Sequence, residues 1–403
     1  MKRMKRRISL PSLTIAVALL ASCLGFAYAK AKNVCLVLYM VADNNLEPFL
    51  ADDLYELLGS DGISQPTLNT WVYFDPHGDL YDYDLDGENE SPFFDDNGPL
   101  IFAYDHTEQA LLNLGSIDEL NSDDPSVLCS FLQLALADCV DKEAEEYVLA
   151  FSSHGGGHAG FGGDENIIRR SRRHLVQSNA DVVRGIQCGL AGVEGAPEEL
   201  DLIGFDACLM SSLLAVEHYA PITKYILASE AVEPGHGWYW DLPTAGVENA
   251  LSMGMELLSS YISETQNPLG EGKHLTPKTL SLIDTTSGFP DFLDSFKTFV
   301  KELARLLLLG TDQDFVVSIQ RTRNSVLAFE SAEDHPGSQN PTAVDIGSFL
   351  SVFSKMCDPD PSSDLAEALE DAVLAYSAQF VARDVGVGTR PATGMAVYFP
   401  SKQ

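Results

Sequence analysis

The sequence predicts an α/β fold, with a mostly parallel central sheet and helices on both of its faces. Two observations support this prediction. Short apolar runs of strand length recur along the chain, and continuous runs of this kind are typical of strands buried on both faces. Stretches with apolar residues at helical spacing fall between them, as in alternating α/β proteins. The hydrophobic fraction of 45% over 403 residues is sufficient for a sizeable core.

The expected elements follow one another in strand–helix order along the chain. Strands are expected at 35–41, 71–74, 147–151, 202–205, 225–228, 280–283 and 396–399. Helices are expected at 46–58, 127–137, 182–190, 209–219 and 292–309. Two loops are expected. One is an acidic insertion over 75–97, and the other is a segment over 155–179 that is rich first in Gly and then in Arg. A soft internal boundary is expected near 266–274, within one domain over 30–403.

The N-terminus has the pattern of a signal peptide. A basic start is followed by an apolar run and by Ala27-Tyr28-Ala29, which predicts cleavage before Lys30 and therefore a signal peptide over 1–29. A second interpretation is a lipoprotein box ending at Cys23, which would anchor the mature chain to the cell envelope. Because the residues after Cys23 stay apolar, we favour soluble secretion. No later stretch is long and apolar enough to span a bilayer.

Charge and cysteine usage narrow the classes of function. The chain has 59 acidic and 25 basic Lys and Arg residues, for a net charge of −34. Loss of 1–29 would bring this charge to −39, because that segment has five basic residues and no acidic one. Such a surface disfavours nucleic acid and favours cationic substrates, although solubility alone would also explain it. The seven cysteines form no C-x-x-C pair, which disfavours structural zinc, and at least one thiol is expected to be free.

Two expected strand ends carry the residues for a catalytic pair. His154 and three glycines follow one buried strand, and Asp206-Ala207-Cys208 follows the next. Ligands of parallel sheets bind at the carboxyl ends of the strands, so both side chains are expected in one crevice. There, His154 would activate the Cys208 thiol, and the backbone of Gly155 and Gly156 would hold the oxyanion. A lone Cys or His is more often structural, so it is the joint pattern that indicates catalysis.

The chain resembles the clostripain-like cysteine peptidases, relatives of caspases, gingipains and legumain. The residues that carry the resemblance are 39–47 (YMVADNNLE), 153–157 (SHGGG), 206–210 (DACLM), 229–230 with 233–238, and 394–400 (GMAVYFP). The resemblance implies a caspase-like three-layer sandwich and a His154–Cys208 dyad. It also implies cleavage after Arg or Lys. The chemistry itself is expected to need no cofactor, although calcium dependence occurs in the resembled family.

The resemblance further implies that Asp206 lines the specificity pocket. A buried carboxylate there would select a cationic side chain. Glu230 and Glu233 are weaker candidates for a second acid in the pocket. The alternative for Asp206 is an N-cap of the helix expected from 209.

A basic cluster lies between the histidine and cysteine motifs. It contains Arg169, Arg170, Arg172 and Arg173, in an otherwise acidic chain. The resemblance implies activation by cleavage in this region, so we expect a monomer that is cut into two associated chains. The alternatives are a solvated basic loop, and a cut made by another protease.

A second acidic motif has the opening of a calcium-binding loop. Asp82, Asp84 and Asp86 precede Gly87 in the D-x-D-x-D-G order, but Phe93 stands where such a loop needs Glu. A Ca²⁺ site and a solvated acidic loop are therefore both open at this point.

Three other functions fit parts of the sequence. The HGGG run at 154–157 is also typical of serine esterases, but no G-x-S-x-G motif accompanies it. His154 and His158 have the spacing of metal ligands on a helix, but the glycines between them are poor helix formers. A catalytically silent binding module on the same fold is the third alternative, and the presence of both dyad residues argues against it.

Overall fold

The computed structural model describes residues 31–77, 98–165, 177–242, 247–263, 278–309, 313–329, 341–386, 389 and 391–400. The signal segment with Cys23, the Asp82–Asp86 motif, the basic cluster 169–173 and the boundary expected near 266–274 all lie outside these residues.

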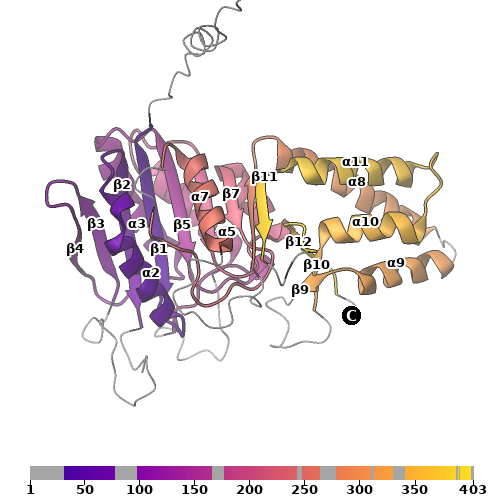
Figure 1. The fold of residues 1–403 in the computed structure, drawn as a ribbon, viewed down its shortest axis with the longest axis horizontal. Helices are drawn as coiled ribbons and strands as arrows, with labels where there is room; N and C mark the ends of the chain where they lie inside the picture. The colour runs from indigo at the N-terminus through magenta and orange to yellow at the C-terminus, as the bar shows by residue number, and fades with distance from the viewer. Residues whose placement is uncertain are drawn as a thin grey trace, which may run out of the picture. The chain divides into compact units, whose positions relative to one another are not determined.

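A nine-stranded sheet forms the centre of the described chain (Figure 1). Its strand order is β11-β8-β7-β6-β5-β1-β2-β3-β4. The five central strands are parallel: β2 (Leu68–Pro76), β1 (Val34–Ala42), β5 (Glu146–Ser152), β6 (Leu200–Asp206) and β7 (Thr223–Ala228). Antiparallel strands extend both edges: β3 (Leu100–Asp105) and β4 (Ala110–Ser116) at one, β8 (Thr279–Asp284) and β11 (Phe380–Val385) at the other. The mostly parallel sheet predicted from sequence is therefore confirmed.

Strand β1 shows why the apolar runs are continuous. Its nine residues are all buried, and alternate side chains point to opposite faces of the sheet. Cys35, Val37, Tyr39 and Val41 share a core with α3 (Pro125–Asp141) and α5 (Asn179–Ala191). The side chains between them share the second core, with α2 (Glu47–Gly59) and α7 (Ala250–Ile262). Helices thus cover both faces, in the expected three layers.

The C-terminal third was only partly predicted. Helices α8 (Gly288–Leu308), α9 (Gln313–Ser325), α10 (Ile346–Cys357) and α11 (Asp364–Ala378) gather beyond β11 (Figure 1). A small antiparallel sheet of β12 (Ala396–Tyr398), β10 (Ala343–Asp345) and β9 (Ala328–Phe329) lies beside them. The run at 396–399 thus belongs to this small sheet and not to the central one. Of the described helices, none combines the length and the apolar character that crossing a bilayer requires.

Two disulfides fasten one helical layer. Cys35 of β1 is bonded to Cys139 of α3, and Cys129 of α3 is bonded to Cys188 of α5. The free thiols of the described residues are Cys208 and Cys357. The expectation of at least one free thiol is confirmed, and Cys208, the candidate nucleophile, is one of the two.

Candidate active site

Parallel pairing brings the histidine and cysteine motifs to the same edge of the sheet. Ser152, the last residue of β5, pairs in register with Asp206, the last residue of β6. His154 and Cys208 each follow two residues later, at the carboxyl ends of adjacent strands. Both turns therefore leave the sheet side by side, where ligands of parallel sheets bind.

Gly155 shows how closely the two turns approach. A Cβ atom built on Gly155 would lie 2.0 Å from the Cys208 carbonyl oxygen and 2.8 Å from its nitrogen. No side chain fits in that space, so only glycine allows the histidine turn to rest on the backbone of Cys208. The glycine after the histidine is therefore required by packing against the cysteine turn.

His154 is oriented by a residue from a third strand end. Asn45, three residues beyond β1, places its Oδ1 2.8 Å from His154 Nε2. An amide oxygen only accepts hydrogen bonds, so this contact requires the tautomer with the ring proton on Nε2. Asn44 braces the same region, because its Nδ2 donates to Gly163 O and Ser153 Oγ, at 2.9 and 3.2 Å.

Cys208 lies in a braced turn before α6 (Leu213–Tyr219). Its Sγ accepts the Glu233 N–H at 3.3 Å. The next residue, Leu209, has φ = +67°, a left-handed conformation that is strained for leucine, and its N–H donates to Ala231 O. Burial raises the pKa of the Cys208 thiol, and the charge of Asp206 raises it further. The hydrogen bond from the Glu233 N–H lowers this pKa but does not cancel the increase. The thiol thus needs a base to ionise it. His154, at the end of the adjacent strand, is placed to be that base.

Asp206 does not cap a helix. The N-cap of α6 is Ser212, whose side chain accepts from Ala215 N, and the helix begins four residues later than expected. Asp206 is 4% exposed, and its oxygens accept from Trp238 N at 2.9 Å and from Trp240 Nε1 at 3.2 Å. The capping interpretation of Asp206 is therefore wrong.

A second carboxyl group, from Glu233, adjoins Asp206. Burial raises the pKa of Asp206 to about 6, although the hydrogen bonds from Trp240 and Trp238 lower it. Burial and the neighbouring charge of Asp206 raise the pKa of Glu233 well above its usual range. Glu233 as a whole is partly exposed, but its carboxylate oxygens are buried, and its backbone N–H donates to Cys208 Sγ. Two acids thus share a low-dielectric space beside the candidate nucleophile, where a cation would stabilise both carboxylates.

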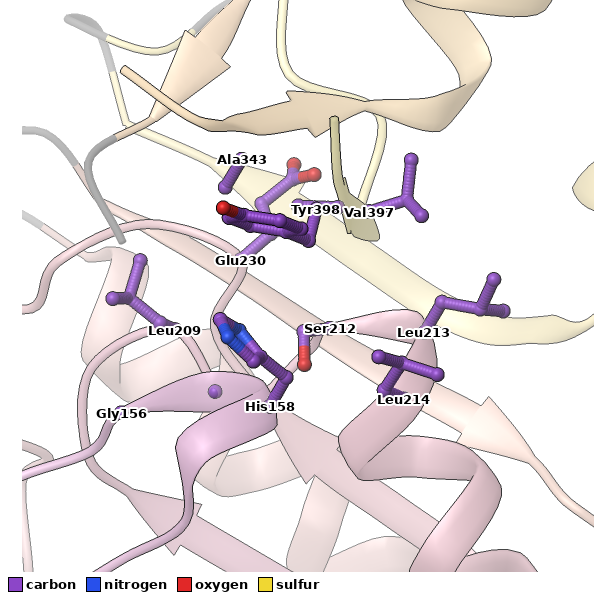
Figure 2. A pocket seen from close by; sticks show the side chains of 12 residues that line it. Gly156, His158, Leu209, Ser212, Leu213, Leu214, Glu230, Ala343, Val397 and Tyr398 are labelled. Atoms are coloured by element: carbon purple, nitrogen blue, oxygen red, sulfur yellow. The ribbon is translucent and has the colours of Figure 1, made fainter. Parts of the chain in front are cut away.

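The structure does not bring Glu230 to this pair. Its Oε1 accepts from Gly394 N at 2.7 Å, and its neighbouring charges are those of Asp345 and Arg383. Figure 2 shows Glu230 in a separate pocket, together with Leu209 and Ser212. His158 lines the same pocket, and its ring lies against Tyr398, with centroids 5.0 Å apart (Figure 2). Of the two glutamates expected as candidates for a second acid, Glu233 therefore adjoins Asp206 and Glu230 does not.

The two glycines expected to hold an oxyanion differ. Gly156 N donates to Gly160 O at 2.8 Å, so this donor is already engaged in the turn. Gly155 lies against the Cys208 backbone. Gly155 remains the candidate of the two, while the hydrogen bond of Gly156 argues against its N–H in that role.

Known peptidases have sequences and structures similar to those of this chain. A model of the clostripain family, peptidase family C11, matches residues 38–401. The chain belongs to the clostripain family of cysteine peptidases. It is 28% identical to clostripain of Hathewaya histolytica over 232 residues, which are 53% of this chain and 41% of that protein. The match therefore spans less than half the length of this relative.

Solved structures of clostripain-family proteases share the fold. One is a secreted C11 cysteine protease from Bacteroides thetaiotaomicron, with a TM-score of 0.62 at 16% identity, covering 91% of this chain and 93% of that one. Another is an inactive zymogen C11 protease from Parabacteroides distasonis, with a TM-score of 0.60 at 14% identity, covering 93% and 94%. The caspase-like sandwich implied by the sequence is thereby confirmed.

Asn45 is the site residue that the sequence did not single out. It lies within the family motif at 39–47, at the end of a third parallel strand. That position could have indicated that Asn45 belongs to the site. Trp238 lies within the resembled segment 233–238 but was given no role, and Trp240 was missed, because their contacts with Asp206 join segments about 30 residues apart.

We expect Asn45→Ala to lower kcat by about tenfold or more, with little change in KM. A positioned general base contributes roughly 10²–10⁴-fold to the rate, and a base that is not held in place loses part of this contribution. Steady-state kinetics on a fluorogenic peptide measures this split. Asn45→Asp, which keeps an acceptor oxygen, is the matched control and should retain most of the activity. Wild-type kinetics in Asn45→Ala would show that the contact does not position His154.

Proposed function

We propose that this clostripain-family protein is a secreted cysteine endopeptidase that cleaves after Arg or Lys. His154 and Cys208 are its catalytic pair. The observation that carries the proposal is the buried Asp206–Glu233 pair beside Cys208 Sγ, at the strand end next to the one that bears His154. A fold shared with other peptidases would not by itself define a specificity.

The proposed reaction follows from the groups at the two strand ends. His154 Nδ1 takes the proton of the Cys208 thiol, and the thiolate attacks the scissile carbonyl carbon. The carbonyl oxygen becomes an oxyanion that accepts the Gly155 N–H. The imidazolium then gives its proton to the leaving amine as the C–N bond breaks, which leaves a thioester. Water, deprotonated by His154, hydrolyses the thioester and restores the thiol.

The specificity follows from the same two acids. A guanidinium or ammonium group beside Asp206 and Glu233 stabilises their ionised forms, which burial otherwise disfavours. It also offsets the Asp206 charge that raises the pKa of Cys208. A basic substrate would thus favour the thiolate that attacks it, so the proposed pocket couples binding to activation of the nucleophile.

We further propose an extracellular location for the mature enzyme. The signal pattern at 1–29 supports it, and so do the two disulfides, which persist in oxidising compartments. A lipid anchor at Cys23 remains the alternative, and the mass of the purified mature N-terminus distinguishes the two.

A positional scan of fluorogenic peptides tests the proposed activity. The position before the scissile bond is varied through all side chains, and initial rates are compared at equal peptide concentration. The proposal predicts that Arg and Lys exceed every uncharged residue there. An enzyme that prefers uncharged residues would refute the specificity, and a pure, folded protein without activity on any peptide would refute the function.

We expect activation by cleavage at Arg169, Arg170, Arg172 or Arg173. These residues follow the histidine strand and would be substrates of a pocket that selects cations. Wild type should run as two bands on a denaturing gel, and Cys208→Ala as one. The fragments should stay associated on gel filtration, because β5 and β6 pair in one sheet from opposite sides of the cut.

The matched variant for this activation replaces the four arginines with alanine. It should remain a single chain and be less active. An intact wild type with full activity would mean that the cluster is not an activation switch. Cleavage of Cys208→Ala during expression would instead assign the cut to another protease.

A further inference from the structure

Tyr261 brings a buried hydroxyl group to the active-site edge of the sheet, from a helix outside the two catalytic turns. Helix α7 begins beside the amino end of β5, because Ala250 N donates to Glu146 Oε2 at 2.6 Å. It then packs along β5, β6 and β8. Its 13 residues extend about 20 Å, close to the length of a seven-residue strand. Tyr261, the twelfth of them and 2% exposed, therefore lies near the strand ends that carry the catalytic turns.

Lys278 holds the backbone and the ring of Tyr261. Its Nζ donates to the Tyr261 carbonyl oxygen at 3.0 Å and lies 4.9 Å from the ring centroid. The Tyr261 hydroxyl group, in contrast, is buried and has no hydrogen-bond partner in the described part of the chain. Buried tyrosine hydroxyl groups usually have a partner, because burial removes the water that would otherwise solvate them. The ring is therefore fixed in place while its polar end is left for another group.

The carboxylate of Glu233 has a similar unmet requirement. Its Oε1 and Oε2 are both buried, and neither accepts a hydrogen bond from the residues that the structure describes. The loop that bears Glu233 reaches Tyr261 through His236, whose ring centroid lies 6.4 Å from that of Tyr261. The next residue, Gly237, lies against Asp206, because a Cβ atom built on it would be 2.9 Å from Asp206 Oδ1. One turn of this loop thus joins the surroundings of Asp206 to those of Tyr261.

The charges that act on the Tyr261 hydroxyl group are those of the proposed active site. Burial raises the pKa of Tyr261 well above its usual range, and the charges of Glu233, Asp206 and Cys208 raise it further. The hydroxyl group therefore keeps its proton, and its oxygen retains lone pairs that can accept hydrogen bonds. It lies in the field of the two acids that are proposed to select a cationic side chain.

Three buried oxygens, two from Glu233 and one from Tyr261, thus accept no hydrogen bond in one region of the described chain. Nor do they bond to each other, although a hydroxyl group could donate to a carboxylate. The raised pKa of Glu233 favours its protonated form when no cation is present. A cation that enters displaces this proton, and the Glu233 oxygens then need donors. The arrangement points to a ligand that donates several hydrogen bonds in different directions.

The number of donors distinguishes the two basic side chains. A guanidinium group has five N–H donors in a planar fork, whereas an ammonium group has three on one nitrogen. Asp206 already accepts from Trp238 N and Trp240 Nε1, which leaves fewer of its lone pairs for a ligand. The carboxylate oxygens can satisfy the three donors of an ammonium group. A guanidinium group has two donors more, for which the Tyr261 oxygen is an acceptor in the same region.

We infer that Tyr261 is a specificity-determining residue of the cation pocket, whose hydroxyl oxygen accepts a guanidinium N–H and so favours Arg over Lys before the scissile bond. The inference rests on the proposed function, because it concerns the same pocket. It extends that function, since the charges of Asp206 and Glu233 attract both cations and do not by themselves distinguish them.

Tyr261→Phe tests the inference, because it removes the hydroxyl group and keeps the ring that lies beside Lys278. Steady-state kinetics gives kcat/KM on three fluorogenic peptides that differ only in having Arg, Lys or norleucine before the scissile bond. Tyr219→Phe is the matched control. It also loses a buried hydroxyl group, but one that donates to Asn179 Oδ1 at 2.9 Å, in the core on the opposite face of the sheet. The melting temperature of each variant shows whether it folds.

We expect Tyr261→Phe to lower kcat/KM at least about tenfold for the Arg peptide and at most about threefold for the Lys peptide, because a hydrogen bond to a charged group is lost only with Arg. The norleucine peptide should be unaffected. Tyr261→Phe should melt no lower than wild type, since it removes an unpartnered group, whereas Tyr219→Phe should melt lower and keep the wild-type ratio of Arg to Lys. A ratio that Tyr261→Phe leaves unchanged would overturn the inference, and a lower melting temperature with it would assign the hydroxyl group to stability.

A binding measurement separates this inference from the proposed function. Calorimetry on Cys208→Ala, with and without Tyr261→Phe, measures the affinity for the Arg and Lys peptides in the absence of cleavage. The Arg peptide should lose affinity at least about tenfold with Tyr261→Phe, and the Lys peptide should not. Selection of Arg through Tyr261 in this assay, in a protein that cleaves no peptide, would contradict only the proposed function. Cleavage after Arg and Lys in a ratio that does not depend on Tyr261 would contradict only the inference.

Discussion

Cys208→Ala is expected to abolish peptide cleavage without altering the fold. The side chain is the free thiol at the end of β6, and its Sγ accepts the Glu233 N–H. Replacing the CH2SH side chain with a methyl group removes the nucleophile, and neither His154 nor water can form the thioester. Activity should fall to the uncatalysed background, while the melting temperature should remain close to that of wild type.

Cys357→Ala is the matched control, because Cys357 is the other free thiol of the described residues. It lies at the end of α10, and its loss should leave kcat unchanged. His154→Ala should be nearly as damaging as Cys208→Ala, because burial keeps the thiol protonated without a base. Full activity in Cys208→Ala, or loss of activity in Cys357→Ala alone, would place the nucleophile elsewhere.

The second large effect is expected from Asp206→Asn, which should depress cleavage after Arg and Lys. Loss of a buried partner for a cation costs roughly 2–5 kcal/mol, which corresponds to a fall of about 30- to 5,000-fold in kcat/KM. The same variant should lose far less on a substrate with norleucine before the scissile bond. The ratio of the two kcat/KM values isolates the pocket from the chemistry of the dyad.

Two further measurements keep this prediction falsifiable. Asp206→Asn also changes an acceptor of the Trp238 and Trp240 hydrogen bonds, so Glu233→Gln serves as the second variant and should lower the same ratio. In wild type, the preference for Arg should fall as the pH falls through about 6, because Asp206 is then protonated and loses its charge. A preference for Arg that is unchanged in both variants and across this pH range would exclude the pair from the pocket.

The sequence was sufficient to predict that His154 and Cys208 meet. Their placement depends only on two apolar strands that are parallel and adjacent, and parallel strands end at one edge of a sheet. The central layers could be predicted as well, because each strand of the parallel core contains an unbroken apolar run. The helix after Cys208 was expected to begin at 209, although Ser212, a good N-cap residue, marked its true start.

The remaining features depend on contacts between distant segments. The edge strands β3 and β4 were not expected: β3 is an apolar run that was overlooked, and none of the residues of β4 is buried. The environment of Asp206 is set by Trp238 and Trp240, and Gly237, with φ = +55°, allows that loop to approach its carboxylate. Glu230 and Glu233 likewise have different partners: Glu230 accepts from Gly394 N, whereas Glu233 adjoins Asp206, a difference that a separation of three residues does not reveal.

Covalent labelling tests the central claim most directly. A peptide that carries an irreversible thiol-reactive ketone after arginine is incubated with the enzyme, and the modified residue is located by mass spectrometry. A matched peptide carries norleucine in place of arginine. We predict one adduct per chain on Cys208, faster labelling by the arginine peptide, and no adduct in Cys208→Ala. Labelling of Cys357 with Cys208 unmodified, or equal rates for the two peptides, would contradict the assignment of the nucleophile or of its pocket.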